Sequence, residues 1–267
     1  MARELRGATV LITGASSGIG RATALAMAAA GARAVLVARR ADRLDEIAGV
    51  IAARGGVALA CPADVTVASA VDAAVGSAVA RFGRLDVIVN NAGSGLFATI
   101  EETTEEDLDR MLDVNLKGVF HGVQAALRVM RRQGAGHLIN VASTAGHRGS
   151  PYVGAYCASK SAVLGLTEAL RVELRGSGID VSLVCPGATR TDFFDAALRR
   201  TPHHRGLVGP IESAERVAAR IVAVARRPRA EVMAQPFLRK PLLALNILAP
   251  VIVDRLMAWL VHRQEQD

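Results

Sequence analysis

Short apolar runs alternate with helix-like patterns along most of the chain. The strand-like runs cover residues 9–13, 34–38, 57–61, 86–90, 137–142 and 180–185, and the helical patterns cover 19–30, 42–54, 67–82, 104–130 and 156–175. Strand, helix and strand repeated in this order predict parallel pairing with right-handed crossovers. With a further strand at 231–235, we expect one Rossmann-type doubly wound α/β domain over 1–236, with a mainly parallel seven-stranded sheet.

The last 31 residues, 237–267, have a different pattern and predict an apolar helical C-terminal extension. The stretch Leu242–Val261 is very apolar, but Asn246, Pro250, Asp254 and Arg255 interrupt it. A proline and two charges argue against a membrane-spanning helix. Two interpretations stay open: a helix pair packed on the substrate cleft or a subunit interface, and a peripheral membrane contact through 237–263, which has basic residues at both ends.

Composition narrows the class of protein. Hydrophobic residues make up 51% of the 267 residues and aromatics only 3%, which suits a buried parallel sheet covered by small-residue helices. The net charge is +7, but the arginines are scattered and lack base-stacking aromatics, so we expect no nucleic-acid partner.

Cysteine usage and the N-terminal pattern indicate the compartment. Cys61, Cys157 and Cys185 have neither disulfide-like nor metal-like spacing, which favours a reducing compartment. The first apolar run is too soon broken by Gly14 and Gly18 to be a signal peptide. We therefore expect a cytoplasmic protein, with membrane association through the extension left open.

A glycine-rich turn follows the first strand and opens the first helix. Ligands of parallel sheets bind beyond the carboxyl ends of the strands, and a helix N-terminus attracts phosphate. The spacing here is G-x-x-x-G-x-G rather than the general G-x-G-x-x-G. The turn predicts a dinucleotide phosphate site made by Gly14, Ser16, Ser17, Gly18, Ile19 and Gly20.

The second strand bears on the choice of cofactor. An acid there would bind a ribose 2′-hydroxyl, but the chain has Arg39 and Arg40 and no acid before Asp42. Two arginines favour NADP(H) over NAD(H) because a guanidinium pairs with a phosphate. After the third strand, Asp64 (followed by Val65) either contacts the adenine or caps the next helix.

The chemistry is predicted at Tyr156 and Lys160, which are four residues apart and share one face of a helix. A free tyrosine is a poor base at neutral pH, and a lysine cation beside it favours the phenolate. Such a phenol can donate a proton to a carbonyl oxygen or remove one from an alcohol. Ser143 follows the fifth strand, where its hydroxyl could hold the substrate oxygen.

These residues together resemble the short-chain dehydrogenase/reductase family. The resemblance runs from about Leu5 to Thr191 and rests on the motifs Thr13–Gly20, Asn90–Gly93, Asn115, Ser143, Tyr156, Lys160 and Pro186–Gly187. It implies an NADP-dependent enzyme acting on CH–OH groups, and a homodimer or homotetramer formed through the fourth and fifth helices.

The resemblance also implies a role for each matching position. Tyr156 is the general acid/base, Lys160 lowers its pKa and binds the nicotinamide ribose, Ser143 orients the carbonyl, and Asn115 holds a water that links Lys160 to solvent. The remaining cofactor contacts are Asn91, Ala92 and Gly93 on the adenosine side, and Pro186, Gly187, Thr189 and Thr191 on the nicotinamide side.

The substrate region after Gly187 gives less information. The cluster Arg199–Arg205 is either a solvated loop or a contact for an acidic group on a substrate or carrier. His203 and His204 lack a third ligand nearby, so no metal is expected. The leading hypothesis is reduction of a hydrophobic, lipid-like or steroid-like carbonyl. The alternatives are a 3-oxoacyl thioester reductase acting on an acyl carrier and a non-catalytic NADP-binding sensor.

Overall fold

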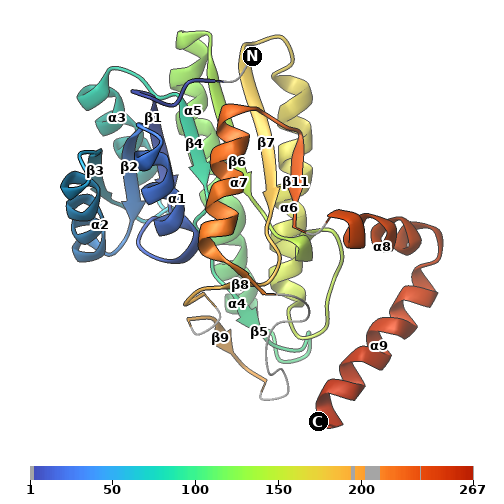
Figure 1. Ribbon diagram of the computed structural model, residues 1–267. Helices are drawn as coiled ribbons and strands as arrows, with labels where there is room; N and C mark the ends of the chain where they lie inside the picture. The colour runs from blue at the N-terminus through green and yellow to red at the C-terminus, as the bar shows by residue number, and fades with distance from the viewer. Residues whose placement is uncertain (1–2, 194–195, 202–210, 235, 267) are drawn as a thin grey trace.

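A computed structural model shows that the protein is built on one seven-stranded sheet (Figure 1). The structure describes residues 3–193, 196–201, 211–234 and 236–266. The strands of the sheet are β1 (Thr9–Thr13), β2 (Arg33–Ala38), β3 (Val57–Pro62), β4 (Val87–Asn90), β6 (Gly136–Val141), β7 (Ile179–Cys185) and β11 (Glu231–Met233). Their order is β11-β7-β6-β4-β1-β2-β3, and every pair is parallel. The predicted doubly wound sheet is confirmed.

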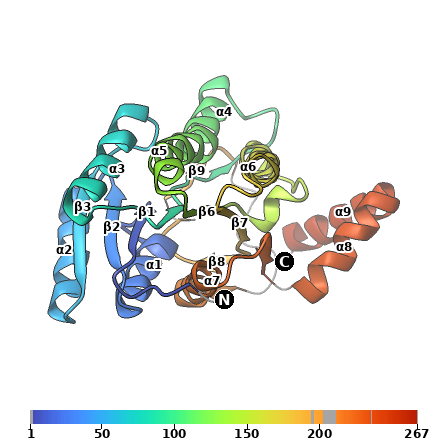
Figure 2. The ribbon, with the colours of Figure 1, turned by 90° about the horizontal axis from the view of Figure 1, so that it is seen from above.

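Helices cover both faces of the sheet, as the view from above shows (Figure 2). One face holds α1 (Gly18–Ala29), α2 (Ala41–Ala53) and α7 (Ala214–Arg226), and the other holds α3 (Ala68–Phe82), α5 (Gly118–Gln133) and α6 (Gly154–Glu173). Side chains of one strand alternate between the faces: Val10 and Ile12 pack in the core with α1, α2 and α7, whereas Leu11 packs in the core with α3, α5 and α6. Each face thus has its own apolar core.

Helix α7 was not anticipated from the sequence, although its pattern was available. Ser213 accepts a hydrogen bond from Arg216 N at the helix start, and apolar residues then recur at helical spacing. The buried residues of this stripe are Val217, Ala218, Ile221, Val224 and Ala225. The helix fills the groove beside α1 and completes the second core.

The single helix expected over 104–130 is divided in the structure. It comprises α4 (Glu105–Leu112), a π-helical turn η1 (Asp113–Lys117) and α5. Thr104 begins it with a capping box to Asp107, which agrees with the predicted helix start. The widened turn contains Asn115, and π-helical turns are frequent at functional sites.

Small elements cover the carboxyl end of the sheet. They are β5 (Leu96–Phe97), η2 (Thr144–Gly146), β8 (Thr189–Arg190), β9 (Leu198–Arg199) and β10 (Glu212–Ser213). Strand β5 pairs with β9 and β8 pairs with β10, so the chain after β7 folds back over the end where ligands bind in this topology.

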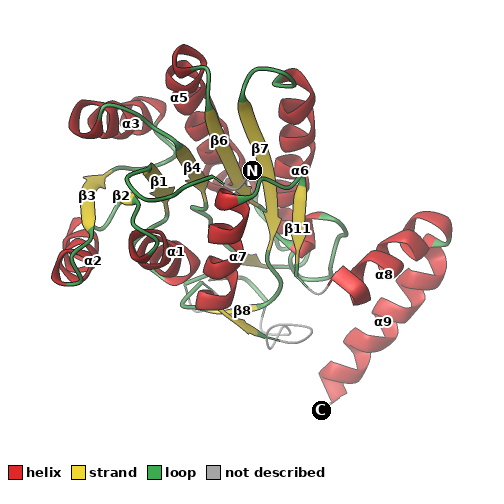
Figure 3. Cartoon of the chain, turned by 45° about the horizontal axis from the view of Figure 1, so that its top comes forward, coloured by secondary structure: helices red, strands yellow, loops and turns green. Residues whose placement is uncertain are grey.

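The C-terminal extension forms two helices, α8 (Pro236–Leu248) and α9 (Pro250–Gln266), which stand to one side of the sheet beyond β11 and α6 (Figure 3). Among the described residues, no single helix is long and apolar enough to cross a membrane. The pair Pro241–Leu248 and Pro250–Trp259 passes that test together, but it is bent by 119°.

Candidate active site

The glycine-rich turn has a backbone that only glycine tolerates. Gly14 and Gly18 have positive φ angles of 68° and 52°. A Cβ on Gly20 would lie 2.1 Å from the Gly14 carbonyl oxygen. Ser17 precedes α1 and makes no side-chain cap to its first turn. A tight glycine cradle at a helix N-terminus left without a side-chain cap fits a pyrophosphate group.

The turn is fixed against the loop after β4. The Thr13 hydroxyl accepts hydrogen bonds from Asn91 N at 2.9 Å and Ala92 N at 3.0 Å, and Asn91 Nδ2 donates to Thr13 O at 3.0 Å. A Cβ on Gly14 would meet Ala92 Cα at 2.8 Å. The predicted cofactor residues Asn91 and Ala92 therefore lie directly beside the glycine turn.

The two arginines after β2 take different positions. Arg40 donates to Ser16 Oγ at 3.1 Å, which places its guanidinium at the glycine turn. Arg39 is exposed and close enough to Asp64 to help lower the pKa of that carboxyl. Both guanidinium groups therefore lie on the side of the site that the sequence assigns to the adenosine ribose.

The Asp64 carboxylate does not cap helix α3, and it is already hydrogen-bonded within its own loop. Its Oδ1 accepts from Thr66 N at 2.9 Å and from Thr66 Oγ1 at 2.8 Å, whereas α3 begins only at Ala68 with Val67 as its N-cap. Burial tends to raise the pKa of Asp64, but these hydrogen bonds and Arg39 outweigh it and lower the pKa. The helix-capping interpretation was therefore wrong: Asp64 closes a turn ahead of the helix. The neighbouring Val65 side chain is buried against Gly118 of α5.

Ser143 and Tyr156 meet at the carboxyl edge of the sheet, where β6 ends and α6 begins. The Ser143 hydroxyl lies within hydrogen-bonding reach of Tyr156, where it tends to lower the phenol pKa, and it accepts a hydrogen bond from Ala145 N at 3.1 Å. The bond to Ala145 fixes Ser143 at the start of η2. The two residues that the sequence assigns to the substrate oxygen are thus in direct contact.

Lys160 lies one helical turn beyond Tyr156 and is buried. Its Nζ donates to Val141 O at 3.3 Å and lies 5.9 Å from the centroid of the Tyr156 ring. Burial lowers the pKa of Lys160 to about 8, because a desolvated ammonium is unfavourable.

The expected lowering of the tyrosine pKa does not occur in this structure. Burial raises the pKa of Tyr156 to about 12, and the hydrogen bond from Ser143 only partly opposes that rise. The Lys160 ammonium lies over the ring face rather than beside the hydroxyl, so burial dominates the pKa of the phenol. The phenol is therefore in its protonated, proton-donating form.

Asn115 is held in the widened turn by three hydrogen bonds. Its Oδ1 accepts from Ser94 N at 2.8 Å, and its Nδ2 donates to Ser94 O and to Ser159 Oγ, both at 3.0 Å. A Cβ on Gly93 would lie 3.1 Å from Asn115 Oδ1 and 3.4 Å from Lys160 Nζ. Gly93 therefore lies beside Asn115 and Lys160, whereas the sequence assigned it to the adenosine side of the site.

The predicted nicotinamide-side residues follow β7. Thr144 N donates to Pro186 O at 2.9 Å, and Thr189 Oγ1 donates to Gly187 O at 3.0 Å. A Cβ on Gly18 would lie 3.1 Å from the Thr191 side chain. This loop therefore joins the glycine turn to the Ser143 loop, around the place where a nicotinamide would lie.

Phe193 was not selected from the sequence, but it lies beside Tyr156 at the edge of the site. Its ring packs against Tyr156 with centroids 5.8 Å apart and an interplanar angle of 59°. A Cβ on Gly95 would lie 3.0 Å from the Phe193 ring. Only the folding of the post-β7 loop over the sheet end brings these residues together.

The described part of the basic cluster binds its own chain. Arg200 makes two hydrogen bonds of 3.1 Å with the carboxylate of the buried Asp107, and Arg199 lies over the Phe97 ring at 4.5 Å from its centroid. Both arginines are exposed, which agrees with the solvated-loop interpretation, and they also fasten the substrate loop to α4 and β5. Residues 202–205, including His203 and His204, lie outside the described residues.

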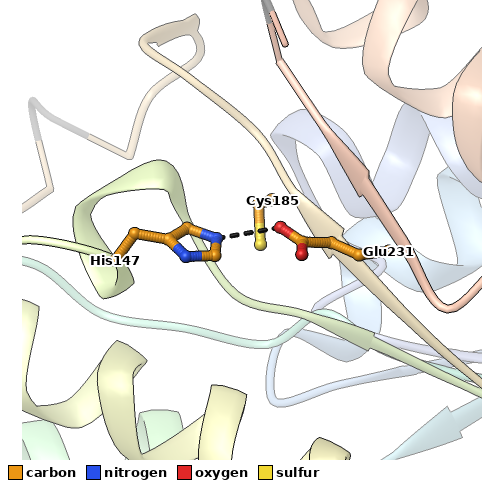
Figure 4. Close-up of side chains that lie close together, drawn as sticks. All are labelled: His147, Cys185 and Glu231. Carbon is orange, nitrogen blue, oxygen red and sulfur yellow. Dashed lines mark ion pairs between the residues drawn. The ribbon is translucent and has the colours of Figure 1, made fainter. Parts of the chain in front are cut away.

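His147, Cys185 and Glu231 form a cluster that joins the loop after β6, β7 and β11 (Figure 4). Their potential ligand atoms all lie within 4.8 Å of one another, and His147 Nε2 is 2.9 Å from Glu231 Oε1. Burial and the Glu231 carboxylate raise the pKa of the Cys185 thiol well above its usual range. The three side chains link the loop after β6 to the neighbouring strands β7 and β11.

The comparisons with known proteins agree with this geometry. The short chain dehydrogenase family model matches residues 8–201. An uncharacterized oxidoreductase of Staphylococcus saprophyticus is 43% identical over 188 residues, which cover 70% of this chain and 76% of that protein. A 3-oxoacyl-[acyl-carrier-protein] reductase of Synechocystis is 40% identical over 184 residues, covering 68% and 74%.

Solved structures show the same fold. A short chain dehydrogenase/reductase of Burkholderia phymatum in complex with NAD has a TM-score of 0.85 and 29% identity, with 94% of this chain and 96% of that chain covered. An alcohol dehydrogenase of Thermococcus sibiricus complexed with 5-hydroxy-NADP has a TM-score of 0.75 and 31% identity, covering 85% and 95%. The chain belongs to the short-chain dehydrogenase family and is an oxidoreductase of that family.

Proposed function

We propose that the protein reduces a ketone or aldehyde on a hydrophobic substrate with NADPH, or oxidises the matching secondary alcohol. The observation that carries this proposal is the contact between Ser143 and Tyr156 at the carboxyl edge of the sheet, with the buried Lys160 one helical turn away. Those three side chains lie in one loop-and-helix segment beside the glycine turn.

The residues divide the work of carbonyl reduction. Bound NADPH supplies the hydride. The protonated Tyr156 donates a proton to the substrate oxygen, and the Ser143 hydroxyl holds that oxygen in line. Lys160 binds the nicotinamide ribose, and Asn115 keeps the lysine in place and holds the water that links it to solvent. Thr191 and the loop that includes Phe193 close the site over the reacting atoms.

The cofactor preference rests on the two arginines after β2. Arg40 reaches the glycine turn at Ser16, Arg39 neighbours Asp64, and no acid precedes Asp42 to bind a 2′-hydroxyl in their place. A 2′-phosphate between two guanidinium groups gains charge-assisted hydrogen bonds that NADH cannot form.

The substrate class follows from the walls of the site. Phe193 faces Tyr156, and the described arginines of the substrate loop are bound to Asp107 and Phe97. An aromatic wall and internally paired arginines favour an apolar substrate over an acidic carrier. A 3-oxoacyl thioester is the second candidate substrate, because the similar Synechocystis protein is a 3-oxoacyl-[acyl-carrier-protein] reductase. A non-catalytic NADP-binding sensor would not need the complete Ser143, Tyr156 and Lys160 set.

Tyr156→Phe tests the mechanism, with Tyr152→Phe as its control because the chain has only these two tyrosines. Loss of the general acid lowers kcat by about 10²–10⁴-fold, whereas the Kd for NADPH is unchanged. Tyr152→Phe retains near-normal turnover. Full activity of Tyr156→Phe contradicts the assigned role.

Arg39→Ala and Arg40→Ala test the cofactor preference, with Arg43→Ala as the matched control. Arg43 is an exposed arginine on α2 that pairs with Glu46. Each of the first two changes raises the Kd for NADPH by about tenfold or more and leaves the Kd for NADH little changed. Preference for NADH in the unmodified protein overturns this part of the proposal.

Turnover of a carbonyl panel separates the substrate candidates. Long-chain aldehydes and steroid ketones are compared with a 3-oxoacyl thioester on an acyl carrier, with NADPH oxidation as the readout. Light scattering of the same samples tests the expected homodimer or homotetramer formed through α5 and α6.

A further inference from the structure

Helix α8 presents an apolar stripe away from the protein. Five of its exposed residues recur at spacings of four, three, one and three residues along one helical face. They are Phe237, Pro241, Ala244, Leu245 and Leu248. Phe237 is 92% exposed and Leu248 is 82% exposed, which is unusual for large apolar side chains that repeat along a helix.

Helix α9 continues the same pattern. Ile252, Leu256 and Trp259 lie on one face at i, i+4 and i+7, and they are 60%, 44% and 55% exposed. At the corner between the helices, Ile247 and Val251 are also exposed. The apolar patch, defined as these outward residues of α8 and α9, is therefore continuous along the chain through the bend.

The orientation of the two helices is fixed by contacts on their other faces. Val253 is fully buried, and Leu243 packs against the core shared with α6. Arg148, in the loop that follows Ser143, bonds to Asn246 and lies 2.7 Å from the Asp254 carboxylate. Since these inward contacts are already made, the apolar patch cannot be explained as the face that anchors the helices to the domain.

The charges around the apolar patch indicate what covers it. From Pro236 to Trp259 the chain has three basic residues, Arg239, Lys240 and Arg255, and one acid, Asp254, which is paired with Arg148. The whole protein carries a net charge of +7. The excess of basic over acidic residues in this segment suits an anionic surface and disfavours a second copy of the same basic chain.

We propose that the apolar patch of α8 and α9 binds the surface of an anionic lipid bilayer. The bend of 119° keeps the pair from forming one straight span, and the apolar outer faces suit helices that lie in the interface. The basic residues then interact with lipid headgroups while Leu248, Ile252 and Trp259 enter the acyl boundary. This inference does not depend on the proposed reaction.

Trp259 provides the measurement, because it is the only tryptophan of the chain. The full-length protein is mixed with phosphatidylcholine vesicles, with and without phosphatidylglycerol, and tryptophan emission and co-sedimentation are followed. We expect a blue shift and sedimentation with the anionic vesicles, weakened by added salt. The paired change Leu248→Glu and Ile252→Glu lowers the partition coefficient by about tenfold or more.

Val57→Glu is the matched control. Val57 is an exposed apolar residue, 45% accessible, at the start of the edge strand β3 and outside the extension. It should leave vesicle binding unchanged, and both variants should keep the wild-type circular dichroism and thermal midpoint. Absence of binding to anionic vesicles by the intact chain overturns the proposal. Normal vesicle binding by the paired glutamate variant also overturns it. If the variant instead changes only the oligomeric state, a second copy of the chain covers the patch, and the proposal is again overturned.

Discussion

Lys160→Met should make the protein more stable at neutral pH while removing its activity. Lys160 is buried, and burial lowers its pKa to about 8, compared with about 10.4 in an unfolded chain. At pH 7 the lysine is charged in both states, so the folded state bears the unfavourable energy of a desolvated ammonium. The difference between the folded and unfolded pKa of Lys160 corresponds to about 3 kcal/mol of lost stability at pH 7.

Methionine has a similar length and no charge, so it removes that penalty. The lost hydrogen bond to Val141 O offsets about 1 kcal/mol, which leaves a gain of about 2 kcal/mol in the free energy of unfolding. For a chain of this size, we expect a rise of about 4–8 °C in Tm. The proposed function predicts a loss of turnover, because it assigns the nicotinamide ribose to Lys160.

The pH dependence gives the sign of the effect. Between about pH 8 and 10 the unfolded chain binds more protons at this lysine than the folded chain, so wild-type stability rises with pH. Above pH 10 the trend reverses, because the pKa of Tyr156 is raised to about 12 and only the unfolded phenol ionises. In Lys160→Met, the free energy of unfolding should no longer rise between pH 8 and 10, but it should still fall above pH 10.

Urea unfolding of both proteins at pH 7 and at pH 9.5 measures these changes. Lys117→Met is the control, because Lys117 is an exposed lysine that pairs with Asp113 and stays charged at both pH values. A Lys160→Met variant that is no more stable than wild type at pH 7, and has the same pH slope, refutes the reasoning.

Two further changes test the loops around the site. Gly20→Ala places a methyl group against the Gly14 carbonyl oxygen, so we expect the Kd for NADPH, measured by fluorescence titration, to rise by about tenfold or more; unchanged binding contradicts the tight turn. Arg200→Gln releases the substrate loop from Asp107, so KM rises several-fold while the NADPH Kd stays constant, as steady-state kinetics can check; a change in kcat alone contradicts it.

The central sheet could be predicted because its strands are buried on both faces. Runs such as Thr9–Thr13, with three consecutive aliphatic residues at its centre, are buried without interruption, and helices of period 3.6 separate them. The first strand matches the prediction residue for residue. The glycine turn could also be located from the sequence, because Gly14 and Gly18 mark positions where the backbone takes a positive φ angle.

Features that depend on long-range contact could not be predicted. Asp107 and Arg200 are 93 residues apart, and only the folded substrate loop brings them together. The rise in the pKa of Tyr156 could not be predicted for a similar reason. Spacing in the sequence shows that Lys160 lies one turn away, but it does not show that both groups are desolvated. Burial, rather than proximity, sets the sign of that shift.

The C-terminal extension shows the limit of hydropathy as a guide. Its apolar residues are consistent with a packed helix pair, because composition does not reveal which face meets the domain. In the structure, Val253 and Leu243 supply the packing while Leu248 and Ile252 remain outside. Arg148 fixes that choice by binding Asp254, and it lies in the same loop as Ser143, the proposed partner of the substrate oxygen. If the apolar patch meets a bilayer, this ion pair holds the catalytic loop close to the source of an apolar substrate, so Arg148→Ala should weaken turnover of membrane-dissolved carbonyls more than that of water-soluble ones.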